Sequence, residues 1–258
     1  QYPLPTRDAA FTAVVAGALP MDFQWFFGGV PLTNGGRFSG AISPVLAIQN
    51  AQVADVGSYW LIASNSFGSV TSAVVTLSLA TTRYVNLNNG SPAAPYTNWT
   101  KAATVIQDAI DVSGPGDEII VTNGTYATGG RILLSNLLNR VVVDRPVTLR
   151  SVNGPAVTLI QGVATPASSA IRCAYLTNGA TLSGFTLQSG GTRSTGNFFQ
   201  LQCGGGALCS SASAVLTNCI INGCRASAGN GGGTYSGTLN NCTISGNTAV
   251  QGGGAASA

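Results

Sequence analysis

Short apolar segments recur along the last third of the chain. Segments 215–221 (VLTNCII) and 238–244 (TLNNCTI) place Leu, Cys and Ile at the same three positions, 23 residues apart (216 to 239). Such segments, interrupted by Asn, Gly and Ser, are too short for helices and predict strands. A recurrence at a period of roughly 20–30 residues is typical of a solenoid, in which each turn buries its apolar face against its neighbour.

Equivalent residues of stacked strands should form columns along such a solenoid. Strands in register repeat at ~4.8 Å, and segment 181–187 fits the same template as the two later segments. We therefore expect inward-facing columns, and a corner at which side-chain amides hydrogen-bond from turn to turn. The expected columns are Leu182, Leu216 and Leu239, then Phe185, Cys219 and Cys242, with Asn218 and Asn241 at the corner.

Residues 1–80 show a different pattern, which indicates a separate domain. Phe23, Trp25 and Phe27 are spaced two residues apart before a Gly-Gly turn, and residues 75–79 alternate between apolar and polar. Several such short strands, separated by Gly, Asn and Pro turns, predict a β-sandwich. Within this domain, residues 55–65 read D-x-G-x-Y-x-x-x-A-x-N, which resembles strand F of immunoglobulin-like domains.

The resemblance to bacterial immunoglobulin-like domains implies roles for several residues. Tyr59 would form the tyrosine corner, and Trp25 would be the core tryptophan of strand C. The bridging cysteines of the family are absent, with Leu61 at the second position and Val14 or Val15 at the first. The sandwich is therefore expected to depend on apolar packing alone.

Residues 84–126 are predicted to form the cap and first coil of the second domain. Residues 99–112 have helical spacing, and Gly114-Pro115-Gly116 should end the helix. Its expected apolar face consists of Ala102, Val105, Ile106, Ala109 and Ile110. Such a helix would cover the end of the first coil, whose backbone groups would otherwise be open to pairing.

The second domain, residues 84–258, looks like a right-handed parallel β-helix of the pectin-lyase-like kind. Segment 117–126 (DEIIVTNGTY) is similar to the opening strand of many such folds, and residues 140–258 would form the regular coils. Segment 241–255 also resembles the Gly-Gly-Ala and Asn-x-Ala repeats of polymorphic outer-membrane adhesins. The sequence predicts an all-β protein whose β-helix is truncated and continues past Ala258.

The composition favours an extracellular or cell-surface location. Only 7% of residues are charged, whereas 34 are Gly and 45% are apolar. We expect no membrane span, because no apolar run reaches the ~20 residues that cross a bilayer. We also expect no nucleic-acid partner, because the formal charge is +3 and there is one Lys and no basic cluster.

Residues suited to catalysis are scarce. The chain has no His and no Cys-x-x-Cys pair, so we expect neither a metal site nor a cofactor. Asp144 is the last acidic residue, so the regular coils lack the paired carboxylates of glycosidases and the calcium ligands of pectate lyases. We predict no catalytic residue. The acids that could cluster at the cap are Asp108, Asp111, Asp117, Glu118 and Asp144, which a solvated helix face or turn also explains.

Candidate contact residues lie in two places. Arg150 and Arg172 are 22 residues apart (150 to 172) and could project side by side with no acid nearby. Such a pair could grip an anionic sugar or abstract a proton, or the two could be solubilising surface residues. Arg193, Phe198 and Phe199 lie in a long excursion, where the phenylalanines either fold over the solenoid wall or contact a sugar ring or a neighbouring subunit.

The six cysteines all lie between residues 173 and 242. Cys219 and Cys242 share a repeat phase and are expected to be stacked, inward-facing thiols. Cys203 and Cys224 fit no column, so they are the candidates for a disulfide in an oxidising compartment.

Three hypotheses for function follow from the sequence. The first is a non-enzymatic extracellular structural or adhesive protein that assembles head to tail into a filament of its own copies. The second is a relative of polysaccharide lyases or glycosidases that acts on an anionic glycan. The third is a carbohydrate-binding adhesin, for which polysaccharide is the expected partner.

Overall fold

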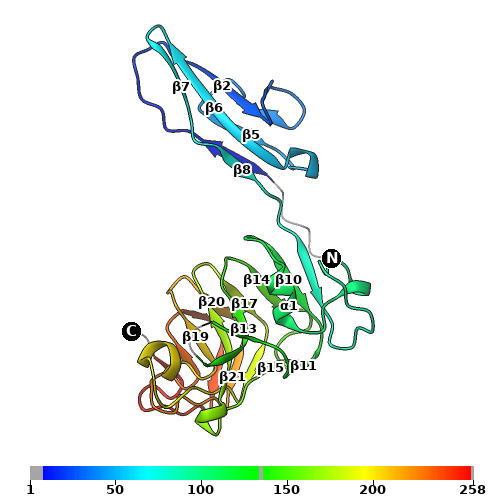
Figure 1. Cartoon of the computed structure of the whole chain (residues 1–258), viewed down its shortest axis with the longest axis vertical. Coiled ribbons are helices and arrows are strands. Elements are labelled where there is room, and N and C mark those ends of the chain that lie inside the picture. The colour runs from blue at the N-terminus through cyan, green and yellow to red at the C-terminus, as the bar shows by residue number, and fades with distance from the viewer. Residues whose placement is uncertain (1–7, 134–135, 257–258) are drawn as a thin grey trace. The chain divides into compact units, whose positions relative to one another are not determined.

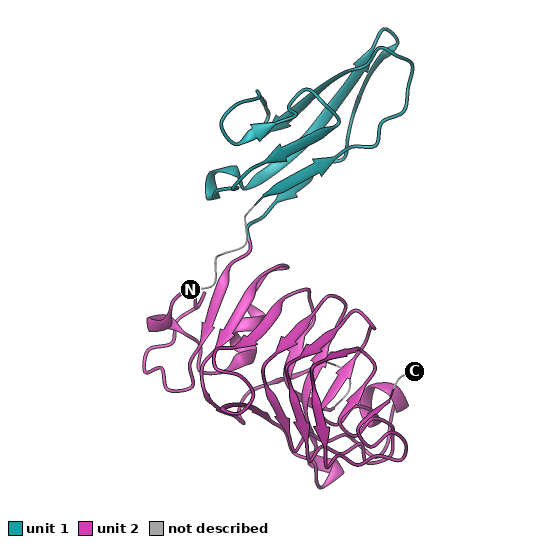
Figure 2. Cartoon of the chain, turned by 180° about the vertical axis from the view of Figure 1, so that it is seen from behind, with its two compact units in different colours: residues 1–79 teal, residues 80–258 magenta. Residues whose placement is uncertain are grey.

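Two kinds of apolar pattern give two compact units, Gln1–Leu79 and Ala80–Ala258 (Figure 2). The computed structural model of the chain describes residues 8–133 and 136–256. Within this described part, none of the helices has the length and apolarity needed to cross a bilayer.

The first unit contains two antiparallel sheets, as its period-two pattern predicts. One sheet orders β1 (Ala9–Thr12), β5 (Val45–Ile48) and β4 (Phe38–Ser39). The other orders β3 (Val30–Pro31), β2 (Asp22–Phe27), β6 (Gly57–Asn65) and β7 (Gly68–Thr71), with β8 (Val75–Leu77) also paired to β6 (Figure 1). A single 3₁₀ turn, η1 (Val53–Asp55), precedes β6.

The core of the first unit confirms the predicted roles of Trp25 and Tyr59. Trp25 is buried, and the Tyr59 hydroxyl donates a hydrogen bond of 2.6 Å to the carbonyl of Asp55, which is the tyrosine-corner geometry. Of the two positions predicted opposite Leu61, Val14 is fully exposed, whereas Val15 is partly buried and packs against the cluster that contains Leu61. Phe11 also packs there, against the rings of Trp25 and Tyr59, with centroids 6.1 and 5.1 Å away.

The second unit consists of three stacked sheets, consistent with a β-solenoid. The first orders β9 (Thr82–Val85), β10 (Glu118–Val121), β14 (Thr148–Ser151), β17 (Thr181–Ser183), β20 (Val215–Thr217) and β23 (Thr238–Asn240). The second orders β11 (Gly124–Tyr126), β15 (Thr158–Gln161), β18 (Thr186–Gln188), β21 (Ile220–Asn222) and β24 (Thr243–Ser245). All the strand pairs of these two sheets are parallel.

The third sheet positions the candidate functional site. It orders β12 (Arg131–Ile132), β13 (Leu138–Val143), β16 (Ile171–Leu176), β19 (Ala207–Cys209), β22 (Thr234–Tyr235) and β25 (Ala255–Ala256). Only the β12–β13 pair is antiparallel among these described strands. Two short helical turns, η3 (Ala167–Ser169) and η4 (Phe198–Gln202), follow β15 and β18 in the chain.

The predicted columns are present. Leu182 is in register with Leu216, which is in register with Leu239, and the first two are fully buried. At the corner, Asn218 and Asn241 adopt φ values of 53° and 49°, in the left-handed region that Asn tolerates better than most residues. The side-chain nitrogen of Asn241 donates to the side-chain oxygen of Asn218 over 2.6 Å, so the amides do connect successive coils.

The helix expected over residues 99–112 is shorter than predicted. It is divided into a 3₁₀ turn, η2 (Trp99–Lys101), and α1 (Ile106–Asp111). The break arises because Ala103 pairs in parallel with Val85: its N–H donates to the Tyr84 carbonyl over 2.9 Å, and its carbonyl accepts from Asn86 over 2.8 Å. The apolar residues Ile106, Ala109 and Ile110 of α1 join the solenoid core, as their spacing predicted.

We expect Leu216→Ala to lower the free energy of unfolding of the solenoid by about 2–5 kcal/mol, since a fully buried leucine is lost between two others. The matched control is Val157→Ala, at a side chain 41% exposed, which should cost about 0.5 kcal/mol or less. Denaturant unfolding of both variants measures the difference. Equal losses would contradict the stacking of this column.

Candidate functional site

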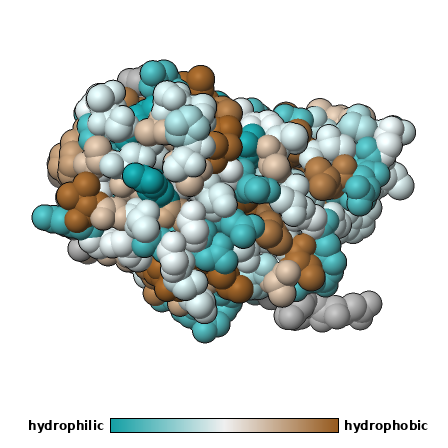
Figure 3. All heavy atoms as spheres, turned by 90° about the horizontal axis from the view of Figure 1, so that it is seen from below, coloured by the Kyte–Doolittle hydropathy of each residue, from teal (hydrophilic) through white to brown (hydrophobic). Residues whose placement is uncertain are grey.

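Apolar side chains line up on the outer face of the third sheet. On the face of the molecule shown in Figure 3, hydrophobic residues are dispersed among polar ones. The third sheet differs, because its register aligns one outward-facing residue from each successive strand. These residues are Val142, Tyr175, Leu208, Tyr235 and Ala256. With Cys203, they form an apolar cluster separate from the solenoid core.

The turn η4 packs beside this column. The side-chain oxygen of Asn197 accepts a hydrogen bond of 2.9 Å from the backbone N–H of Gln200 and so begins the turn. The ring of Phe199 lies 6.1 Å from that of Tyr235, while Phe198 meets Phe199 edge to face at 5.4 Å. Of the two alternatives for this excursion, the structure shows one phenylalanine at the solenoid wall, although both rings remain partly exposed.

A pocket of about 240 Å³ opens between η4 and the third sheet. Its apolar walls are Tyr175, Phe199, Leu208 and Tyr235, and its polar groups come from Gln200, Ser210 and Ser236. Its lining, as described, contains no charged side chain. Aromatic walls with a few convergent polar groups are the usual construction of a site for a small uncharged ligand.

Tyr175 and Tyr235 are largely buried in the wall of the pocket, at 9% and 6% exposed. Neither hydrogen-bonds through its hydroxyl to another described residue, and neither hydroxyl oxygen is fully enclosed. Burial raises the pKa of Tyr235, with a smaller contribution from Cys203. The phenol therefore stays neutral at physiological pH and can both donate and accept hydrogen bonds.

Arg172 is buried, and its hydrogen bonds connect the end of η4 to the third sheet. It is 1% exposed, and burial lowers the pKa of its guanidinium to about 10. Its nitrogens donate to the backbone carbonyls of Gln200, Cys203 and Gly204, each over 2.8 Å, and to the side chain of Asn139 over 2.9 Å. Charge-assisted bonds of this kind fix the end of η4 next to the sheet.

The predicted pair of Arg150 and Arg172 is therefore corrected. Arg150 belongs to β14 of the first sheet, whereas Arg172 belongs to β16 of the third. Arg150 also has the acidic neighbour that the sequence did not predict, because its Nε lies 2.8 Å from a carboxylate oxygen of Glu118. Neither arginine is placed to share a ligand with the other.

Arg193 and the predicted disulfide also differ from expectation. Arg193 donates to the backbone carbonyls of Ala167 and Ser168, so it braces η3. Cys203 and Cys224 are both free thiols, and they belong to different clusters, Cys203 outside the third sheet and Cys224 in the solenoid core. The sheet that separates these two clusters explains why the predicted bond is absent.

The acidic residues of the second unit are mostly bound to arginines. Asp117 is buried, accepts from the backbone N–H of Thr81 and Gly114, and forms an ion pair with Arg83 at 3.0 Å. Burial raises the pKa of Asp144, but hydrogen bonds from Arg145 and Arg131 outweigh it, so the pKa lies below its usual value.

Asp108 differs from these arginine-bound acids in the direction of its pKa shift. Burial, and secondarily the neighbouring Asp111, raises its pKa. Asp111 itself is paired with Arg131 at 3.0 Å. The described residues contain no group of three or more His, Cys, Asp or Glu side chains placed to hold a metal ion.

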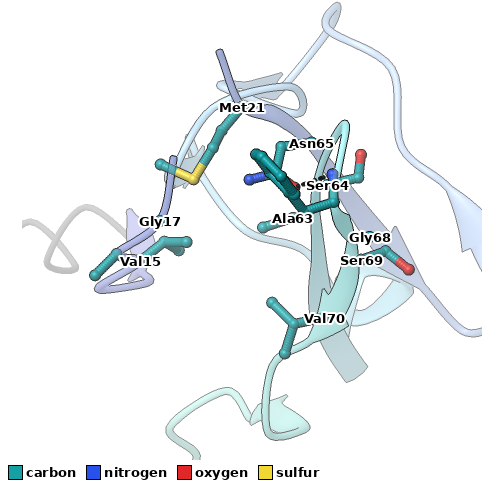
Figure 4. A pocket seen from close by; sticks show the side chains of 11 residues that line it. Val15, Gly17, Met21, Ala63, Ser64, Asn65, Gly68, Ser69 and Val70 are labelled. Atoms are coloured by element: carbon teal, nitrogen blue, oxygen red, sulfur yellow. Dashed lines mark hydrogen bonds between the residues drawn. The ribbon is translucent and has the colours of Figure 1, made fainter. Parts of the chain in front are cut away.

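The first unit has a pocket of its own, about 280 Å³ in volume (Figure 4). It lies between the segment that carries Val15 and Met21 and the β6–β7 hairpin, which Asn65 links to that segment by a 2.9 Å hydrogen bond to the Ala18 carbonyl. Its described lining has no titratable group. It has one aromatic ring, Phe67, whereas the pocket on the third sheet has three.

Sequence reasoning found Phe199 but missed the outward-facing column. The signal was present, because Leu208, Tyr235 and Ala256 each lie two residues after a Gly triplet. Comparing the residues that follow each triplet would have found this column. Tyr175 follows no triplet and could be recognised only from the register.

Replacing the buried guanidinium should loosen η4. We expect Arg172→Met to leave three backbone carbonyls unpaired and to destabilise the solenoid by at least about 2 kcal/mol. Hydrogen exchange over residues 197–203 should accelerate selectively. The control Arg150→Met removes a half-exposed ion pair and should cost about 1 kcal/mol or less. Unchanged exchange in Arg172→Met would show that this arginine does not position the turn.

Comparison with known proteins bears on the first unit. Residues 6–78 match the family model of the immunoglobulin I-set domain. No curated protein is significantly similar in sequence to the chain. The N-terminal unit is thus an immunoglobulin I-set domain, and the region that follows forms stacked parallel sheets consistent with a β-solenoid.

Proposed function

We propose that this chain is a non-enzymatic extracellular adhesive protein whose solenoid binds a neutral carbohydrate in the pocket on its third sheet. The observation that carries the proposal is the uncharged lining of that pocket, with aromatic rings and free hydroxyl groups together. Aromatic faces pack against the C–H surface of a sugar ring, while tyrosine, serine and glutamine side chains exchange hydrogen bonds with its hydroxyl groups.

The spacing of the column supports an oligosaccharide rather than a single sugar. Tyr175 and Tyr235 are separated by one strand, β19, so they lie two rungs apart, or ~9.6 Å at the usual strand spacing. Two linked sugar rings span a comparable length. Each ring would then lie at the exposed edge of one tyrosine, because both tyrosine side chains are largely buried.

The acidic residues support a binding role over a hydrolytic one. Glycoside hydrolysis requires two carboxylates on either side of the scissile bond. None of the acidic residues of the second unit lines the described pocket, and four of them, Asp111, Asp117, Glu118 and Asp144, form ion pairs with arginines. A hydrolase or lyase acting on an anionic glycan remains the alternative, favoured only by the raised pKa of Asp108.

Two finer structural points belong to the same proposal. We infer that the three sheets wind as a right-handed β-helix, because crossover connections between parallel strands are almost always right-handed. We also infer that α1 caps the first coil, since its buried residues Ile106, Ala109 and Ile110 join the core next to Val85 of β9. An extracellular or cell-surface location agrees with the low content of charged residues.

Filament formation by copies of this chain stays a prediction from the sequence. Electron microscopy of the concentrated protein tests it. Fibres or higher oligomers would support assembly, and uniformly monomeric particles would contradict it.

Two neighbouring phenylalanines give a matched test of the carbohydrate site. On an array of neutral and anionic glycans, we expect the full chain to bind neutral oligosaccharides. Phe199→Ala should weaken this binding roughly tenfold, since about 1–1.5 kcal/mol of aromatic contact is lost. Phe198→Ala should change it little, because Phe198 does not line the described pocket.

Three outcomes would overturn the proposed function. One is the absence of any glycan signal for the folded protein. Another is a signal that both phenylalanine variants reduce equally. The third is the release of shortened or unsaturated products from an anionic polysaccharide, which would favour the enzymatic alternative.

A further inference from the structure

We propose that Cys219 and Cys242 are a cross-link site, at which a disulfide joins two successive coils of the solenoid. Each cysteine directly follows a corner asparagine, Asn218 or Asn241, whose amides are themselves hydrogen-bonded. The two thiols are free in the structure, so the proposal concerns their oxidation.

The strand registers align the two cysteines. On one side Thr217 pairs with Asn240, and on the other Ile220 pairs with Thr243, so the positions between them are equivalent. The N–H of Thr243 donates to the carbonyl of Cys219 over 2.9 Å. Neighbouring rungs lie ~4.8 Å apart, within the Cα separations of about 4.4–6.8 Å at which disulfides form.

The side chains of the two cysteines point in the same direction. Cys219 Sγ lies 3.3 Å from the carbonyl oxygen of Thr217, and Cys242 Sγ lies 3.3 Å from that of Asn240, so the two side chains are oriented alike. Equivalent positions and like orientations therefore place the two sulfurs on neighbouring rungs of one column.

Access distinguishes this pair from the other thiols. Cys242 is half-buried, whereas Cys173, Cys203, Cys209 and Cys224 are buried. Cys173 and Cys224 both lie in the core, so neither offers a route for a reagent. Within the described residues, Cys242 is the more exposed member of the pair.

The reaction requires an oxidant, for which a small-molecule disulfide is sufficient. The Cys242 thiolate attacks one sulfur of the reagent, forms a mixed disulfide and expels one thiolate. The Cys219 thiolate then attacks the Cys242 sulfur and expels the second thiolate. Cys242 and Cys219 each lose a proton, one S–S bond is formed in the protein, and the reagent is reduced to two thiols.

The electrostatics favour this order of events. The neighbouring Cys219 thiol lowers the pKa of Cys242 by more than partial burial raises it. The interaction with Cys242, followed by burial, raises the pKa of Cys219. Cys242 therefore has the larger thiolate fraction, which makes it the first nucleophile.

A disulfide between Cys219 and Cys242 would covalently join two coils of an extracellular protein. It closes a loop of 23 residues (219 to 242), which restricts the unfolded chain and so favours the folded solenoid. The oxidising surroundings rest on the proposed extracellular location. The reactivity of the pair is independent of carbohydrate binding and can be measured in the test tube.

Oxidised glutathione acting on the native full chain is the test. We expect the count of free thiols to fall from six to four, the mass to fall by two hydrogens, and one cross-linked peptide to contain both cysteines. The denaturation midpoint should rise on oxidation. Cys242→Ala should abolish the rise, whereas Cys209→Ala, at a buried thiol outside the pair, should retain it.

Three results would overturn this proposal. The first is six free thiols after prolonged treatment of the folded protein. The second is a cross-link between Cys173 and Cys224. The third is a persistent mixed disulfide at Cys242, which would show that Cys219 cannot reach it. Because these are measured on the unmutated chain, they hold even where a variant folds poorly.

Discussion

The in-register stacking of parallel rungs is the constraint from which the rest of the second unit follows. Each coil supplies strands too short to be stable alone, and the backbone ladder to the next coil satisfies their hydrogen bonds. The same ladder places like residues above one another, as with Leu182, Leu216 and Leu239. Inward-facing columns then form the core, and outward-facing columns form extended surfaces.

The candidate site is one of these outward-facing columns, closed on one side by η4. Its position depends on Arg172, which is buried next to the column and binds the backbone carbonyls at the end of the turn. A cation without a buried acidic partner is costly in a protein interior, so its hydrogen bonds to carbonyl oxygens must offset the loss of water. The positive charge of Arg172 therefore stabilises the turn beside the pocket. The pocket itself remains neutral.

Local pattern was sufficient to predict the fold but not the pocket. The repeats around Leu216 and Leu239 and the run around Tyr59 have fixed spacings, so they gave the solenoid and the immunoglobulin-like domain. The length of α1 was missed because the pairing of Ala103 with Val85 is a tertiary contact. The roles of Arg172 and Tyr175 were missed for the same reason, since burial and outward direction depend on the register between coils.

The neutrality of the pocket is the central claim, and the salt dependence of ligand affinity tests it most directly. Titration of the full chain with the best neutral oligosaccharide should give the same affinity at about 0.01 M and 1 M salt, because screening acts only on charges. A large loss of affinity at the higher salt concentration would contradict the account. It would show that binding depends on charged groups of the protein, which the described lining of this pocket lacks.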